Sequence, residues 1–419
     1  MMRDHLNQAV YGAQRSAIRE FSALAKATPG CVSLTLGEPD SDTPEPVRAA
    51  AKRALDNHET HYIPNGGAPA LREKLAQFEA RQGMDYRPEE IIVTAGATEA
   101  LFVALFGILN PGDEVIIPIP AFVLYAEIVR LCRGVPVFLD TAPDGFQIHG
   151  EKLRRLISRR TKAIILNSPN NPTGCVYTPE SLLAVRDAVE NAPVFVLCDD
   201  VYRQLVYADS PAKRAAANGL PAAPAGGAAA PPSDTPPSDA GGAAGGALDD
   251  AYHSFAEFRE LRDRLLVVQS FSKPYAMTGW RMGYLMADRR VMERLELLHQ
   301  FMVVSTPAPF QQAAMAALDF DPAPLRECYR RRRAYVLSRL EGMGLPFARP
   351  RGAFYVFPSV AAYGIPSWEF CTRMVREAGL AATPGVCFGG EGYIRLSYAC
   401  GDELLQTGLD RLERFLVRL

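Results

Sequence analysis

A lysine that could act as a nucleophile stands shortly after one of the apolar runs of the chain. Lys273 follows the run 265–269 and precedes Pro274, which biases it away from a helical backbone. A lysine held partly desolvated at the mouth of a crevice can lose its proton and attack a carbonyl group. An isolated loop lysine is more often solvated, but three polar neighbours change that balance: Ser270, Ser272 and Arg281. Together these groups suit an anionic, phosphate-bearing carbonyl ligand.

A carboxylate ends a second apolar run. Asp199 follows the run 194–198, and a carboxylate at the edge of a buried strand needs a cationic or hydrogen-bonding partner. Two interpretations stay open at this point. Asp199 is either a helix N-cap or a group that holds a protonated ring nitrogen and so stabilises negative charge developing elsewhere in that ring. Tyr202 would place a phenol near the same site, although a lone tyrosine is more often a core or surface residue.

Three other segments could bind parts of an anionic ligand. Asn171 stands in a loop whose turn is set by prolines and Gly174, and by itself it is typical of a turn asparagine. Gly96, Ala97 and Thr98 open a predicted helix, so backbone N–H groups there could receive a phosphate, as at many helix starts. Arg395 lies inside the short apolar run 393–397. A buried guanidinium there requires either a protein acid or a substrate carboxylate.

These residues follow elements that the pattern of apolar residues predicts. Non-alternating runs rich in Val, Ile and Leu indicate strands buried on both faces of a parallel sheet: 91–94, 114–117, 163–167, 194–198 and 265–269. Helical patterns lie between them: 99–109, 122–132 and 179–191. In open α/β sheets the ligand crevice lies outside the carboxyl ends of the strands. We therefore predict an α/β fold with a mostly parallel sheet covered by helices, in which the loops after these runs converge.

Composition excludes several classes of protein. The 419 residues carry 45 Lys and Arg against 47 Asp and Glu, and this near balance argues against a nucleic-acid-binding protein. The eight cysteines form no CxxC pair and no zinc-ligand spacing, so we expect reduced thiols and no metal. Neither a membrane-spanning run nor a secretory apolar segment is present. We expect a cytoplasmic protein that does not bind a membrane.

Taken in order and spacing, these motifs resemble those of the class I/II aminotransferases. That family consists of fold-type I enzymes that depend on pyridoxal 5′-phosphate (PLP). The motifs are Asn171-Pro172-Thr173-Gly174, Asp199-x-x-Tyr202, Ser270-x-Ser272-Lys273, Arg281 and Arg395. The segment Ser33–Asp40 is similar to the family's N-terminal segment. The C-terminal half looks like the bacterial branch called aminotransferase A, which includes enzymes named N-acetyl-diaminopimelate aminotransferases.

The resemblance implies a role at the cofactor for each motif residue. Lys273 would be the internal aldimine lysine and, after substrate exchange, the base that moves a proton between substrate Cα and cofactor C4′. Asp199 would keep the pyridine nitrogen protonated, so that the ring accepts electrons, and Phe122 would stack on that ring. Asn171 and Tyr202 would hydrogen-bond to the ring oxygen O3′. The phosphate would be held by the remaining residues: Gly96, Ala97, Thr98, Ser270, Ser272 and Arg281.

The resemblance also implies the substrates and the partner. Arg395 would grip the α-carboxylate of the amino acid, with Asn171 beside it and with Gly37 allowing the backbone to approach. Tyr62 would reach the phosphate of the neighbouring subunit, which implies a homodimer with shared sites. The implied reaction is the ping-pong transfer of an amino group between an L-amino acid and a 2-oxo acid. No residue that selects the substrate side chain can be identified.

The order of the motifs predicts the domain organisation. Residues 1–45 are expected to pack as an N-terminal segment with the small domain, 46–300 to form a large cofactor-binding domain, and 301–419 to form a smaller α+β domain. The stretch 211–250 consists mostly of Ala, Gly, Pro and Ser and has no family counterpart. It cannot bury enough apolar surface to offset its ordering entropy. We therefore expect a disordered insert within the large domain.

Three other functions fit parts of the sequence. A PLP-dependent C–S β-lyase would share the lysine, the cofactor site and the carboxylate grip. A non-enzymatic PLP-binding regulator would need an attached DNA-binding module, for which the roughly 30 residues before Gly37 are too few. A nicotinamide dehydrogenase would suit an α/β chain, but no Gly-x-Gly-x-x-Gly motif opens a helix. We therefore expect a transaminase.

Overall fold

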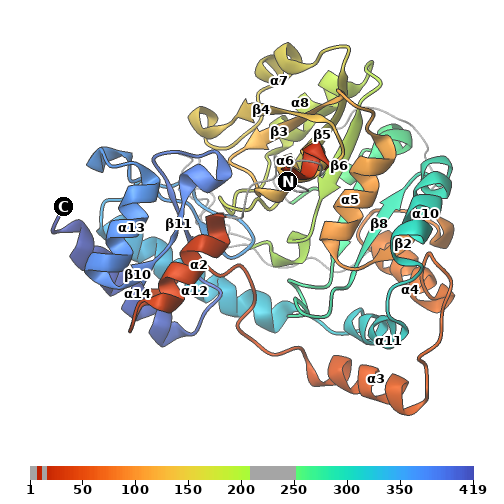
Figure 1. Ribbon diagram of the computed structural model, residues 1–419, viewed down its shortest axis with the longest axis horizontal. Coiled ribbons are helices and arrows are strands. Elements are labelled where there is room, and N and C mark those ends of the chain that lie inside the picture. Colours follow the sequence, from red (N-terminus) through yellow and green to blue (C-terminus); the bar gives the residue numbers. More distant parts are fainter. Residues whose placement is uncertain (1–6, 12–16, 208–251) are drawn as a thin grey trace, which may run out of the picture.

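The computed structural model describes residues 7–11, 17–207 and 252–419 of the chain. The predicted insert 211–250 lies outside these described residues. A seven-stranded sheet forms the centre of the larger part, and the helices nearest the C-terminus gather at the left of Figure 1. In the described ranges, no helix has both the length and the apolar character that crossing a membrane requires.

The large sheet has the strand order β2-β8-β7-β6-β5-β3-β4. Its strands are β2 Ile91–Thr94, β3 Glu114–Ile119, β4 Val135–Asp140, β5 Thr161–Asn167, β6 Phe195–Asp199, β7 Leu265–Ser270 and β8 Gly283–Ala287. β8 is antiparallel to both of its neighbours, β2 and β7, and the other neighbouring pairs are parallel. The five predicted strands therefore point in one direction. Their carboxyl ends meet at one edge of the sheet, as predicted.

The apolar pattern did not predict β4 and β8. β4 is an edge strand whose side chains are mostly exposed or half-exposed and which contains Pro136, so it lacks a continuous buried run. β8 is fully buried, but it begins with Gly283 and contains few β-branched residues. Its strand form depends on pairing with β2 and β7 on either side. Both strands therefore form because they pair with their neighbours in the assembled sheet, and local propensity alone does not specify them.

The described helices are α1 Gln8–Tyr11, α2 Ala17–Ala27, α3 Glu45–Asp56, α4 Pro69–Ala80, α5 Ala97–Ile108, α6 Leu124–Leu131, α7 Gly150–Leu156, α8 Pro179–Val189, α10 Arg289–Val303, α11 Ala308–Ala317, α12 Ala323–Gly342, α13 Ser367–Ala378 and α14 Asp402–Leu416. Local signals set their ends. The hydroxyl of Thr178 accepts a hydrogen bond from the N–H of Ser181 at the start of α8. Gly379 ends α13 with φ 61°, a conformation that favours glycine.

Helices cover both faces of the sheet because successive residues of a strand point to opposite sides. In β5, Ala163 and Ile165 belong to a hydrophobic cluster that includes residues of α5, α6 and α10. Ile164 and Leu166 of the same strand belong to a second cluster, with residues of α3, α4, α8 and α11. This arrangement explains why the strands are almost continuously apolar.

Two small sheets and a third cluster form the other part of the molecule. β1 Val32–Ser33 pairs in parallel with β10 Leu380–Ala381, and β12 Ile394–Ser397 lies between β9 Tyr355–Val356 and β11 Thr383–Pro384. The cluster joins Phe21 and Leu34 with residues of α12, α13 and α14. It also contains Tyr202 from the turn after β6, so the two parts are in contact there. The domain boundaries at 45 and 300 stay a prediction.

A buried ion pair in the large part involves the turn after β6. Both guanidinium amino groups of Arg203 donate to the carboxylate of Glu79 at 2.9 Å, and the hydroxyl of Tyr284 donates to the same carboxylate at 2.5 Å. Glu79 is fully buried and Arg203 nearly so. The pair connects α4, the turn after β6 and β8. Removing one partner would leave an uncompensated buried charge.

We predict that Arg203→Met lowers the free energy of unfolding by about 3–5 kcal/mol, the usual effect of breaking a buried ion pair. Urea denaturation of the purified protein measures this. The matched control is Arg339→Met, which removes a more exposed pair with Asp410 and Glu413 and should cost about 1 kcal/mol or less. Equal losses for the two variants would contradict the prediction.

Candidate active site

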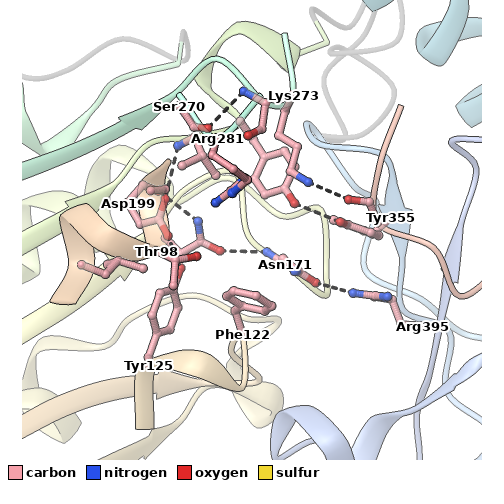
Figure 2. Close-up of a pocket in the computed structure, with 17 residues that line it drawn as sticks. Thr98, Phe122, Tyr125, Asn171, Asp199, Ser270, Lys273, Arg281, Tyr355 and Arg395 are labelled. Atoms are coloured by element: carbon pink, nitrogen blue, oxygen red, sulfur yellow. Dashed lines mark hydrogen bonds between the residues drawn. The ribbon is translucent and has the colours of Figure 1, made fainter. Parts of the chain in front are cut away.

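A cavity of about 270 Å³ lies at the carboxyl ends of the parallel strands. It is lined by residues at or shortly after the ends of β2, β3, β5, β6 and β7, by Gly37, and by one residue each of β9 and β12. Twelve of the predicted site residues line it: Gly37, Ala97, Thr98, Phe122, Asn171, Asp199, Tyr202, Ser270, Ser272, Lys273, Arg281 and Arg395. In Figure 2, Asp199, Thr98 and Tyr125 lie on one side of this cavity and Arg395 on the other. The predicted convergence of the strand-end loops is therefore confirmed.

Lys273 stands beside the cavity with its amine held by the backbone. Its Nζ donates a hydrogen bond of 2.6 Å to the carbonyl of Gly37. Burial is the main cause that lowers the pKa of Lys273, to about 8. Glu38 opposes this shift, and the guanidinium groups of Arg395 and Arg281 add to it. An amine with such a pKa is partly unprotonated near neutral pH, as a nucleophile or base must be.

Asp199 is a buried carboxylate with few partners. The hydroxyl of Tyr125 donates to its Oδ2 at 2.6 Å, and the N–H of Val201 donates to its Oδ1 at 3.4 Å. The short 3₁₀ helix that follows, Arg203–Leu205, has Tyr202 at its N-cap, so the N-cap interpretation of Asp199 is wrong. Burial raises the pKa of Asp199 to about 6, and the hydrogen bond from Tyr125 opposes this shift. A protonated ring nitrogen would give this carboxylate a cationic partner.

One corner of the cavity combines donors that suit a phosphate. Gly96 does not line the cavity, but it precedes Ala97, the first residue of α5, with φ 81°. A Cβ at Gly96 would collide with the guanidinium of Arg281, which donates to the carbonyls of Thr278 and Ala95 at 2.9 and 3.4 Å. The corner thus brings together a helix N-terminus, a guanidinium and two hydroxyl side chains: Ser270 and Ser272.

Arg395 is buried and has only neutral hydrogen-bond partners in the described part of the chain. Its Nη1 donates to Oδ1 of Asn171 at 2.9 Å, and its Nη2 donates to the carbonyl of Thr35 at 2.6 Å. No described residue forms a hydrogen bond with its Nε. The rings of Tyr355 and Phe388 lie 4.6 and 5.0 Å from the guanidinium carbon. A buried cation of this kind still needs an anionic partner. Because no described acid contacts it, a substrate carboxylate is favoured over a protein acid.

Tyr62 is placed differently from the other predicted residues. It does not line this cavity, and its side chain is 88% exposed. Its expected role at a neighbouring subunit's phosphate stays a prediction.

The structure adds cavity residues that the sequence did not single out: Leu101, Tyr125, Asn167, Val201 and Tyr355. Tyr125 lies three residues after Phe122, in the first turn of α6, and that short spacing could have indicated a shared site. Asn167 ends β5 and donates to the carbonyl of Asp199 at 2.9 Å. Tyr355 approaches the cavity from a different sheet, and local sequence patterns carry no signal for that contact.

The residues present fit PLP on chemical grounds. PLP carries an aldehyde, a phosphate, a ring nitrogen and a ring oxygen on one flat ring. The cavity offers an amine of lowered pKa at Lys273, the phosphate corner near Gly96, the buried carboxylate of Asp199 and the amide and phenol of Asn171 and Tyr202. Each group of the cofactor therefore has a chemically matched residue in one cavity.

Comparison with known proteins agrees with this chemistry. Residues 29–412 match the model of the family Aminotransferase class I and II. The chain is 36% identical to a Bacillus subtilis protein named "Probable N-acetyl-LL-diaminopimelate aminotransferase", over 100% of this chain and 97% of that one. It is 37% identical to the aspartate/prephenate aminotransferase of Thermus thermophilus, over 92% and 91%.

A solved structure shows the same fold. The aspartate aminotransferase of Thermotoga maritima superposes with a TM-score of 0.85 at 32% identity, covering 98% of this chain and all of that one. The names of these relatives give no support to a C–S β-lyase. The chain belongs to the class I and II aminotransferase family and is a PLP-dependent transaminase of fold type I.

Proposed function

We propose that the residues around this cavity divide the work of amino-group transfer between an L-amino acid and a 2-oxo acid as follows. Bound PLP supplies an electron sink for the negative charge that develops at the substrate Cα. Lys273 Nζ would be the base that moves a proton between the substrate Cα and the cofactor's C4′. Asp199 holds the proton on the ring nitrogen, and Asn171 and Tyr202 bind the ring oxygen. We also place Phe122 against the ring of the cofactor. The phosphate would be bound by the residues of one corner: Gly96, Ala97, Thr98, Ser270, Ser272 and Arg281.

One observation carries this assignment of roles. One cavity is lined by an amine of lowered pKa, a buried carboxylate and a buried guanidinium whose Nε has no partner in the described part of the chain. Arg395 would bind the α-carboxylate through that free donor. Gly37 lines the same cavity, and its carbonyl accepts a hydrogen bond from Lys273. An amino acid gripped in this way would present its Cα to the lysine.

The expected assembly is a homodimer with shared sites. Tyr62 and Phe301 are 88% and 85% exposed, and burial of such large apolar rings against a second copy would be favourable. Tyr62 would there meet the neighbour's phosphate, as the family resemblance implies. We place the enzyme in the cytoplasm, and the large domain at residues 46–300 with the small domain at 301–419. The eight free cysteines support a reducing compartment.

A half-reaction screen tests the function and narrows the substrate. The PLP-loaded protein is mixed separately with L-aspartate, L-glutamate, L-phenylalanine and N-acetyl-LL-diaminopimelate, while the visible PLP band is followed. Loss of the band with release of the matching 2-oxo acid supports transamination. L-Cystathionine serves as the contrast, because a β-lyase would release pyruvate and ammonia from it. Pyruvate release from L-cystathionine without any amino transfer would contradict the proposal.

We predict that Lys273→Ala abolishes amino transfer and the visible band of bound PLP, because no other amine lines the cavity among the described residues. Absorbance spectra and single-turnover assays of the purified variant measure both. Lys52→Ala, an exposed lysine of α3, is the control and should behave like the wild type. Turnover by Lys273→Ala within tenfold of the wild type would refute the assigned role.

We predict that Arg395→Ala weakens amino-acid binding by about 30-fold or more and leaves PLP bound. Removing one partner of a buried charge pair costs about 2 kcal/mol or more. Spectral titration of the PLP-loaded variant with the amino acid identified above measures the change. Arg414→Ala, on the exposed face of α14, is the matched control. If Arg395→Ala instead loses PLP and retains its affinity for the amino acid, the assigned role is wrong.

PLP uptake by the cofactor-free protein should depend on pH through Lys273. Its pKa is lowered to about 8, so the unprotonated amine that attacks the aldehyde is scarce at pH 6 and prevails above pH 8. We therefore predict an uptake rate that rises from pH 6 and levels off above about pH 9. Stopped-flow absorbance measures it. A rate that is flat or falls across this range would contradict the prediction.

A further inference from the structure

Tyr355 links the two halves of the proposed site. It lies at the start of β9, pairs with Ser397 of β12, and its side chain lines the cavity although it is almost fully buried. In Figure 2 it stands between Lys273 and Arg395. Gly37 packs so closely on it that an added Cβ at Gly37 would collide with the phenol oxygen. The position of this ring is therefore constrained on several sides.

The hydroxyl of Tyr355 forms a pair with that of Tyr202. The two oxygens are 2.9 Å apart, and both side chains are buried. Burial raises the pKa of each phenol, so both stay protonated near neutral pH. One hydroxyl must then donate to the other. If Tyr202 donates its proton to the cofactor's ring oxygen, Tyr355 is left as the donor to Tyr202, and such a chain strengthens each of its hydrogen bonds.

The ring of Tyr355 supports the cation of Arg395. Its centre lies 4.6 Å from the guanidinium carbon, and the ring of Phe388 lies 5.0 Å from the same atom. Arg395 is buried without an acidic partner among the described residues that contact it, so these two π faces stabilise its charge and its position before a carboxylate binds. The ring and the hydroxyl of Tyr355 thus serve different neighbours.

We propose that Tyr355 is a positioning residue with two separable contributions: its hydroxyl holds Tyr202 toward the cofactor's ring oxygen, and its ring holds Arg395 for the substrate carboxylate. This inference rests on the proposed roles of Tyr202 and Arg395. It goes beyond them because one side chain outside the reacting groups connects the cofactor side of the site with the substrate side.

Tyr355→Phe tests the hydroxyl. The variant keeps the ring, so the dissociation constant of the amino acid should stay within about twofold of the wild type. With weaker donation from Tyr202, the cofactor's ring oxygen keeps more negative charge, and the protonated form that absorbs in the visible persists to higher pH. We expect the pH midpoint of the PLP band to rise, and kcat to fall by about two- to tenfold, the worth of one hydrogen bond. An unchanged midpoint would overturn the hydroxyl's role.

Tyr355→Leu tests the ring. Loss of one π face should raise the dissociation constant of the amino acid by a further factor of about 2 to 30 relative to Tyr355→Phe. The midpoint of the PLP band should match that of Tyr355→Phe, because both variants lack the hydroxyl. If the two variants bind the amino acid equally well, the ring's role is overturned.

Tyr398→Phe is the matched control. Tyr398 belongs to the same hydrophobic cluster and its buried hydroxyl donates to the carbonyl of Ala353, but it does not line the cavity. It should lower thermal stability to a similar extent and move neither the midpoint nor the affinity. A midpoint shift in Tyr398→Phe equal to that in Tyr355→Phe would mean that general loosening of the core explains the effect, and would overturn the proposal. Failure of the wild type to take up PLP or to transfer amino groups would instead contradict the proposed function.

Discussion

Burial of charge at one edge of a sheet is the constraint on which the rest of this structure depends. Lys273, Asp199 and Arg395 all line one cavity, where each charge is costly unless another group compensates it. Their hydrogen-bond partners are largely neutral: a carbonyl for Lys273, a phenol and an N–H for Asp199, an amide and a carbonyl for Arg395. The protein thus keeps ionisable groups in a low-dielectric site whose best partners are the cofactor and the substrate, and this favours their binding.

The two parts of the chain contribute different chemistry to that site. The parallel strands of the large sheet bring Asp199, Ser270 and the start of α5 to the cavity, and these are the groups for which we propose roles at the cofactor. The small sheet brings Arg395 and Tyr355 to the same cavity, and for these we propose binding of the substrate carboxylate and support of that grip. Contact between the parts at Tyr202 places both sets at one cavity. On the proposed roles, the large sheet therefore serves the cofactor and the small sheet serves the substrate carboxylate.

Much of the large sheet could be predicted from the sequence, and the reason is local. Buried parallel strands need nearly continuous runs of Val, Ile and Leu, so the five runs marked β2, β3, β5, β6 and β7 to within about two residues at each end. β4 and β8 were missed because an exposed edge and a glycine-led strand depend on their neighbours in the sheet. In the site, Tyr125 and Tyr355 were missed because their importance lies in contacts with Asp199 and Tyr202, which are far from them in the chain.

By itself the sequence determined the types, the order and the spacing of the chemical groups. It also indicated that the strands that carry them are parallel and end at the same edge of the sheet. These properties are local, since propensity and apolar periodicity act over a few residues. Only the tertiary structure decided that Asp199 is a partner of Tyr125 and no helix cap, that Arg395 meets neutral groups and two rings, and that Tyr355 joins Tyr202. Such contacts join residues as many as 360 positions apart, as between Thr35 and Arg395. They arise from the register of packed sheets, which no short stretch of sequence specifies.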